Sequence, residues 1–195
     1  ELEDSKTDIL IEMNKRNPEL FDVYRLNFVT GEMNMTAQNP GNISKWITDH
    51  DGKIRIAITT DGVNSSILYR DNEQEDFVNV MTTSFKDSLI PLLFTFDNKH
   101  VYASTNLGRD KSAIVKYDIK NNKELEVLFE HPDVDVTTIG HSKKRKVLTS
   151  ISYTTWKREK IFLDDEIKQI FSKLESELPG YEIVITDMDD DENVY

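Results

Sequence analysis

Short apolar runs alternate with polar turns along most of the chain. The stretch Ile9–Met33, ILIEMNKRNPELFDVYRLNFVTGEM, is an apolar run, a polar stretch with proline, a second apolar run and Thr-Gly. Further runs with strand character are KIRIAI, SSILYR, HVYAST, SAIVKYD, ELEVLFE and KVLTSISY. DHDGK, TDGVN, FDNK and NLGRDK separate them and supply the Asp, Asn and Gly residues that tight turns need. Short strands separated by turns about every ten residues predict an all-β fold.

The strands recur with a fixed internal spacing. The polar residues that close the second strand of each copy are 44, 47 and 46 residues apart: Asn27, Asp71, Asp118 and Asp164. The first strands begin 18, 17, 17 and 17 residues earlier, at Ile9, Ile54, Val101 and Val147. A period near 45 residues with about four strands is typical of a propeller blade. We therefore predict a partial β-propeller domain over residues 1–195, with about three to four antiparallel blades near residues 9–38, 43–83, 89–132 and 137–163.

One amphipathic helix interrupts the strand pattern. Ile167, Ile170, Phe171, Leu174 and Leu178 have the spacing of one apolar helix face, after Asp164-Asp165 and before Pro179-Gly180. The pattern predicts an inserted helix over 165–178. Two interpretations stand beside each other, a docking helix for another domain and an insertion that covers a blade edge.

After the helix, the sequence predicts the start of a further blade over 181–195. YEIVIT (181–186) has high β-propensity and is the kind of segment that pairs with another chain. The acidic residues 187–192 that follow should repel an identical copy and limit stacking. We expect either a monomer with this strand folded against the helix or a closed dimer through exposed blade edges.

The strand and turn patterns together resemble a known family. ILIEMNKRNPELFDVYRLNFVTGE, NPGNISKWITDHDGKIRIAITTDG, NLGRDKSAIVKYD and SYTTWK are similar to the N-terminal propeller of prolyl-oligopeptidase-family (S9) serine peptidases, in the dipeptidyl and acylaminoacyl peptidase branch. The resemblance implies a C-terminal α/β-hydrolase domain with a Ser-Asp-His triad in the same parent chain. It also implies that the propeller restricts the active site to short or unfolded peptide substrates.

No residue of that triad can be placed on this chain. A nucleophile elbow needs G-x-S-x-G, and no two of the seven glycines are four positions apart. We therefore predict that this chain is a non-catalytic fragment of a serine peptidase. The alternative is a stand-alone propeller-like module that binds a protein partner, and a reading frame continuing into G-x-S-x-G, Asp and His would separate the two.

The charge and hydrophobicity of the sequence limit the kinds of partner that the chain can bind. The net charge of −12 argues against nucleic acid, because phosphate binding needs a basic face. The one basic cluster, HSKKRK (His141–Lys146), is interpreted as a turn between strands, with docking of an acidic partner as the alternative. No apolar run reaches the roughly 18 residues that span a bilayer. The chain has no cysteine and no signal-peptide pattern, and it starts at Glu1, which suggests a trimmed chain and leaves its localisation open.

Candidate reactive residues are few. The histidines are His50, His100, His131 and His141, and the sequence gives none of them a nucleophile and an orienting partner. Asp187, Asp189 and Asp191 alternate as in calcium loops but lack the glycine and the closing glutamate, so we interpret them as an acidic turn. Trp46 and Phe94 occupy similar positions in two copies, which favours packing between blades. We assign no catalytic residue, metal ligand or cofactor.

Overall fold

The computed structural model describes residues 2, 5–189 and 191–192. The chain divides into two compact units, Glu1–Ala103 with Lys116–Glu126, and Ser104–Val115 with Val127–Tyr195. Among the described residues, no helix is long and apolar enough to cross a membrane.

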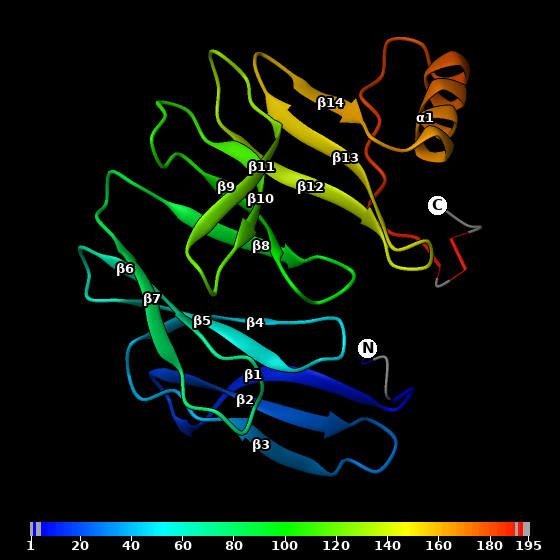
Figure 1. Cartoon of the computed structure of the whole chain (residues 1–195). Coiled ribbons are helices and arrows are strands. Elements are labelled where there is room, and N and C mark those ends of the chain that lie inside the picture. The colour runs from blue at the N-terminus through cyan, green and yellow to red at the C-terminus, as the bar shows by residue number, and fades with distance from the viewer. Residues whose placement is uncertain (1, 3–4, 190, 193–195) are drawn as a thin grey trace. The chain divides into compact units, whose positions relative to one another are not determined.

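Two antiparallel sheets lie wholly in the first unit (Figure 1). The first has the strand order β1-β2-β3 and consists of β1 (Asp8–Asn17), β2 (Leu20–Asn27) and β3 (Met33–Ala37). The second has the order β4-β5-β6-β7 and consists of β4 (Ile43–Thr48), β5 (Ile54–Thr60), β6 (Ser65–Tyr69) and β7 (Val78–Thr83). In both sheets, every strand pairs with its neighbour in sequence, as short turns require.

A third sheet, of order β11-β10-β9-β8, contributes residues to both units. Its strands are β8 (Leu89–Phe94), β9 (Val101–Thr105), β10 (Ala113–Asp118) and β11 (Lys123–Phe129). The fourth sheet lies in the second unit, with β12 (Val136–Ser142), β13 (Val147–Thr154) and β14 (Arg158–Phe162) in that order. The helix α1 (Asp165–Glu177) follows it.

The inner strands are buried on both faces. In β5, Ile54, Ile56 and Ala57 have no exposed surface, and the same holds for Ala113, Ile114 and Val115 of β10. A strand with one solvated face would alternate buried and exposed residues. Burial on both faces is what a blade between two neighbours requires, and it explains why these strands read as continuous apolar runs.

The repeat predicted from the sequence is confirmed at its marker residues. The apolar markers lie at or next to the first residue of a strand. Ile9 is the second residue of β1, and Ile54, Val101 and Val147 begin β5, β9 and β13. The polar set lies at the end of the next strand or two residues beyond it: Asn27, Asp71, Asp118 and Asp164. Asn27 accepts the Val29 and Thr30 N–H groups, and Asp118 accepts the Asn121 N–H. A short side-chain acceptor at this position therefore organises the following turn.

Over the residues that the structure describes, the fold is all-β, with four successive small antiparallel sheets and one amphipathic helix. This succession is that of propeller blades, and the predicted fold class of a partial β-propeller with an inserted helix is confirmed. Asp164 caps α1 by accepting the Ile167 N–H at 3.1 Å. On the buried side of the helix, Phe171 packs against Phe162 of β14 at 5.3 Å between ring centroids.

The prediction of a strand at Tyr181–Thr186 is wrong, because residues 181–189 contain no strand. The segment runs beside α1, where Ile183 and Ile185 line a cavity of about 750 Å³ with Ile170 and Leu174 of the helix. Its alternate apolar side chains are half-buried at the helix and not used in a sheet. A strand needs a neighbour for its backbone N–H and C=O groups, and β-propensity cannot supply one.

The turn between β5 and β6 gives a direct prediction about pH. The Asp61 carboxylate accepts the Asn64 backbone N–H, the Asn64 side-chain N–H and the Val63 backbone N–H, in that order of effect, and these bonds lower the pKa of Asp61 from 3.8 to about 2. Because the folded pKa is depressed, the turn gains stability above pH 3.8 and loses it as the pH falls toward 2. An NMR titration of the Asp61 carboxyl carbon should give a midpoint near 2, and Asn64→Ala should raise it. A midpoint of 3.8 or higher in the unmodified chain would contradict this geometry.

Candidate functional site

Two turns of the first unit bond to each other. They connect β4 to β5 (49–53) and β8 to β9 (95–100). The His50 N–H donates to the Asn98 side-chain oxygen at 3.0 Å, and the Asn98 side-chain nitrogen donates to Asp51 at 3.1 Å. His50 Nε2 lies 2.9 Å from the carbonyl oxygen of Phe94. Successive repeats are thus joined at one end of their strands by polar contacts between equivalent turns.

The Arg55 side chain is buried beneath these turns and is only 10% exposed. Its Nη1 donates to the Asn98 carbonyl at 2.6 Å and lies 3.6 Å from the Asp49 carboxylate. Its Nη2 donates to the Tyr69 hydroxyl at 2.5 Å. The guanidinium carbon is 5.0 Å from the Phe94 ring centroid and 5.5 Å from that of Tyr69, which is cation–π distance. The buried Arg55 guanidinium therefore contacts two aromatic rings and a residue of each of the two turns.

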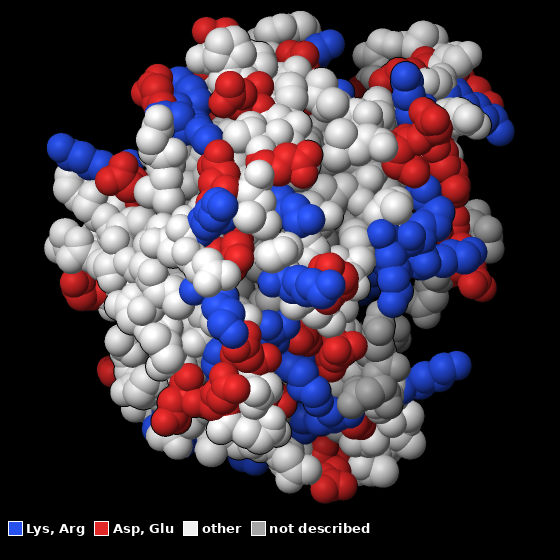
Figure 2. Space-filling model, viewed as in Figure 1, with Lys and Arg blue, Asp and Glu red and all other residues white. Residues whose placement is uncertain are grey.

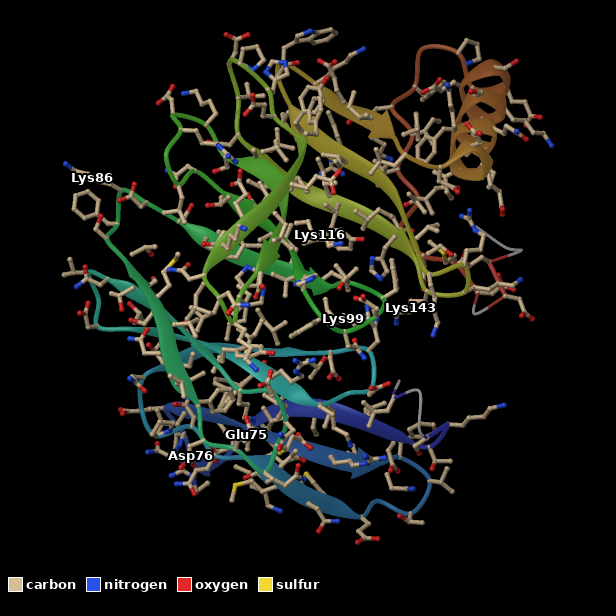
Figure 3. All side chains as sticks on the ribbon, in the orientation of Figure 1. Glu75, Asp76, Lys86, Lys99, Lys116 and Lys143 are labelled. Atoms are coloured by element: carbon tan, nitrogen blue, oxygen red, sulfur yellow. The ribbon has the colours of Figure 1, made fainter. Side chains whose placement is uncertain are left out.

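The network continues through Tyr69 to Asp71 and Lys120. The Tyr69 hydroxyl donates to Asp71 at 2.8 Å, and the Lys120 ammonium donates to the other Asp71 oxygen at 2.5 Å. Lys120 follows β10, so this contact also joins two repeats. We call Asp49, Arg55, Tyr69, Asp71, Asn98 and Lys120 the Arg55 cluster. Figure 3 labels Lys99, which lies on the 95–100 turn.

The pKa values of Tyr69, Asp71 and Lys120 are shifted away from neutral pH. Burial and the hydrogen bond to Asp71 raise the pKa of Tyr69 to about 12. Hydrogen bonds from Lys120 and Tyr69 lower the pKa of Asp71, and Asp71 in turn raises the pKa of Lys120. A group that transfers protons needs a pKa near the working pH. The Arg55 cluster therefore suits a fixed structural anchor better than acid–base chemistry.

The four histidines considered as candidate reactive residues lie in a strand or in the segments between strands. His50 stacks on Phe96 at 4.9 Å between ring centroids, in addition to its contacts in the turn. His131 accepts the Asp133 N–H on Nδ1 and packs against Tyr153. His100 has its backbone N–H bonded to Thr95, and His141 lies in β12. The imidazole rings of His50 and His131 contact backbone groups and aromatic rings.

Phe94 and Trp46 differ in their surroundings. Phe94 is 1% exposed and lies against the Arg55 guanidinium, as the packing interpretation predicts. Trp46 is half-buried, 6.1 Å from the Phe77 ring centroid, and lines a cavity of about 320 Å³. The two aromatic residues therefore occupy similar sequence positions but differ in burial and in their neighbours.

The basic cluster His141–Lys146 comprises the end of β12 and the turn into β13. The predicted turn is confirmed, and Asp191 and Glu192 contact Lys144 within it. Over residues 2, 5–189 and 191–192, no group of three or more histidine, aspartate or glutamate side chains is arranged to hold a metal ion.

The second unit has an aromatic cavity of about 550 Å³ between β14 and the residues after α1. Trp156, Lys160, Phe171 and Tyr181 contribute to its lining. The Lys160 ammonium lies 3.7 Å from the Phe171 ring centroid, and burial lowers the pKa of Lys160. The lining mixes these groups with the acidic Glu159, Glu175 and Glu182, so it has no single charge preference.

Sequence reasoning missed Arg55, Tyr69 and Lys120. A signal for the first was present, because Arg55 stands between two isoleucines in the apolar strand IRIAI. A charged residue in a strand buried on both faces needs partners inside the protein. The sequence alone did not show that those partners come from other turns.

The sequence similarity of the chain is to dipeptidyl peptidases. It is 25% identical to dipeptidyl peptidase family member 6 of Caenorhabditis elegans over 169 residues, 81% of this chain and 22% of that protein. It is 26% identical to dipeptidyl aminopeptidase BIII of Pseudoxanthomonas mexicana over 185 residues, 88% of this chain and 25% of that protein. The resemblance to the dipeptidyl peptidase branch is confirmed, and the chain spans about a quarter of the length of these relatives. No protein-family model matches it.

One solved structure has a similar fold at low sequence identity. TolB from Acinetobacter baumannii matches with a TM-score of 0.56 and 15% identity, over 80% of this chain and 37% of that one. The β-propeller domain of the Trilobed protease from Pyrococcus furiosus matches with a TM-score of 0.42 and 12% identity, over 78% of this chain and 52% of that one.

Proposed function

We propose that the chain is the non-catalytic propeller region of a serine exopeptidase and controls the access of peptide substrates. Residues 1–195 form one partial propeller domain in this proposal, with blades near residues 9–38, 43–83, 89–132 and 137–163. Peptide hydrolysis falls to a C-terminal α/β-hydrolase domain of the same parent chain. That domain and the peptide substrates are then the partners of this chain.

The observation that carries the proposal is the extent of the similarity. An alignment covers 88% of this chain but a quarter of a dipeptidyl aminopeptidase, so the chain corresponds to one region of a peptidase. That region consists here of repeated sheets and contains no G-x-S-x-G sequence. The Arg55 cluster supports the role, because an access-controlling wall must hold its blades in a fixed register.

The chain by itself is expected to hydrolyse no peptide or ester. Incubation with aminoacyl-, dipeptidyl- and acylaminoacyl-chromogenic substrates should give no turnover, because no activated nucleophile is present. A serine-directed fluorophosphonate probe should leave the chain unlabelled, with an authentic serine peptidase as the positive control. Stoichiometric labelling of any serine would overturn the proposal.

The alternative function is a stand-alone propeller-like module that binds a protein partner. The coding sequence beyond Tyr195 distinguishes the two. The proposed function requires a G-x-S-x-G elbow there, followed by an aspartate and a histidine in the order of α/β-hydrolases. A reading frame that stops without them would favour the interaction module.

A further inference from the structure

The side chain of Glu192 contacts the turn between β12 and β13. The Ser142 hydroxyl oxygen lies 2.8 and 2.6 Å from the two carboxylate oxygens of Glu192. The Lys144 backbone N–H donates to the same carboxylate at 3.3 Å, and Arg145 Nε lies 3.6 Å from it. Glu192 is 8% exposed and Ser142 is 1% exposed. A hydroxyl, an amide and a guanidinium therefore converge on one buried carboxylate.

Bonds other than those to Glu192 hold these groups in place. The Ser142 hydroxyl accepts the Arg145 backbone N–H at 2.9 Å, which closes the turn. The Arg145 guanidinium is held from the other side by Asp164 at 2.5 Å and Glu166 at 3.5 Å, at the start of α1. We call Ser142, Lys144 and Arg145 the carboxylate seat. Ser142 and Arg145 are preorganised, because the turn holds the first and the acidic residues at the start of α1 hold the second.

Glu192 fills the seat imperfectly. Arg145 Nε and Nη2 are buried without a hydrogen-bond partner, and 3.6 Å to Glu192 is too long for a hydrogen bond. Glu192 also has φ +54°, a left-handed conformation that is strained for a residue other than glycine. Arg145 Nε therefore lies between two carboxylates without a hydrogen bond to either, Nη2 has none, and the backbone of the present occupant is strained.

The surroundings of the seat favour an acidic ligand. Lys144 Nζ donates to the Asp191 carbonyl at 2.6 Å, and Lys143, Lys144 and Lys146 are exposed. Figure 2 shows basic side chains grouped over the end of this hairpin, where Figure 3 labels Lys143. The ligand already present is acidic, since residues 187–192 read DMDDDE. Exposed cations at the rim would attract such a segment at low salt.

We propose that Ser142, Lys144 and Arg145 form a binding site for a glutamate side chain within an acidic peptide segment, and that Glu192 occupies it as an exchangeable internal ligand. The basic cluster His141–Lys146 then supplies the binding site, and the acidic residues 187–192 supply its internal ligand. Its ligand class is an acidic peptide of another protein with the same pattern. The inference does not depend on the proposed function.

Occupancy by the chain itself determines what an external peptide meets. A tethered ligand competes at an effective concentration of the order of millimolar. An external peptide of comparable intrinsic affinity therefore binds the unmodified chain weakly. Removing Glu192 removes the competitor and leaves Ser142, Lys144 and Arg145 in place.

The test measures binding of a fluorescently labelled peptide with the sequence of residues 186–192, TDMDDDE, with its C-terminus amidated. Fluorescence anisotropy at low ionic strength compares the unmodified chain with Glu192→Ala and with Asp187→Ala as matched control. Asp187 is an exposed acid of the same run outside the seat. Glu192→Ala should bind the peptide at least ten-fold more tightly than the other two, and 0.5 M salt should weaken that binding.

Two further arms keep the test specific. A peptide with glutamine in place of its glutamate should bind Glu192→Ala at least ten-fold more weakly. Adding Ser142→Ala to Glu192→Ala should reduce binding. Lys144→Ala removes the exposed ammonium that holds the Asp191 carbonyl, so it should also reduce binding and leave the fold intact. Equal binding by the unmodified chain, Glu192→Ala and Asp187→Ala, or equal binding of both peptides, would overturn the proposal.

Discussion

Replacing Arg55 by methionine is expected to lower the free energy of unfolding of the first unit by about 3–5 kcal/mol. Methionine keeps much of the length and apolar volume of the side chain, so the change removes the charge and its hydrogen bonds. Asp49, whose side chain is 5% exposed, would be left without its buried cation, and the Asn98 carbonyl would lose its donor. Stranding a buried charge costs more than the intact pair contributes.

Tryptophan fluorescence during denaturant unfolding measures this effect. Trp46 lies in the first unit and Trp156 in the second, so a Trp156→Phe background reports the first unit alone. Lys53→Met, an exposed position two residues from Arg55, is the matched control and should change stability by less than about 0.5 kcal/mol. A loss below about 1 kcal/mol for Arg55→Met would show that Arg55 does not anchor the two repeats.

The sequence predicted the repeat because its determinants are local. Asp51-Gly52 and Asp61-Gly62 occupy turns in which each glycine has positive φ, and Asn27, Asp118 and Asp164 accept N–H groups a few residues onward. Such bonds depend on neighbours in sequence and therefore leave a readable spacing. The helix was equally readable, since its cap and apolar face lie within one short segment.

Features set by distant partners could not be read in the same way. YEIVIT has the composition of a strand, but it lies beside α1 because its apolar side chains find the helix there. The partners of Arg55 come from turns up to 43 residues away, and Glu192 meets Ser142 across 50 residues. Sequence spacing alone carries no information about these approaches, which the packing of the sheets creates.

The Arg55 cluster links stability to the proposed access role. Its contacts join the turns at 49–53 and 95–100 and the segments that hold Asp71 and Lys120. All of these belong to different strand connections of the first unit. An access-controlling region needs such ties, because the repeats are otherwise held by nearest-neighbour packing alone.

Truncating Phe94 to alanine is expected to cost about 3–5 kcal/mol of the unfolding free energy of the first unit. The ring is 1% exposed and supports the Arg55 guanidinium at 5.0 Å, so alanine would create a cavity and remove a cation–π contact. Phe94→Leu is the control, because it restores most of the volume without the π face and should lose less than half as much.

A double-mutant cycle with Arg55→Met separates the two parts of that loss. If the ring stabilises the buried cation, the double variant should lose less than the sum of the single variants, by about 0.5–2 kcal/mol. The measurement uses the same Trp156→Phe background, so every variant in the cycle reports the first unit. Strict additivity would show that Phe94 acts through its volume alone, and a loss below about 1 kcal/mol for Phe94→Ala would contradict its burial beneath the joined turns.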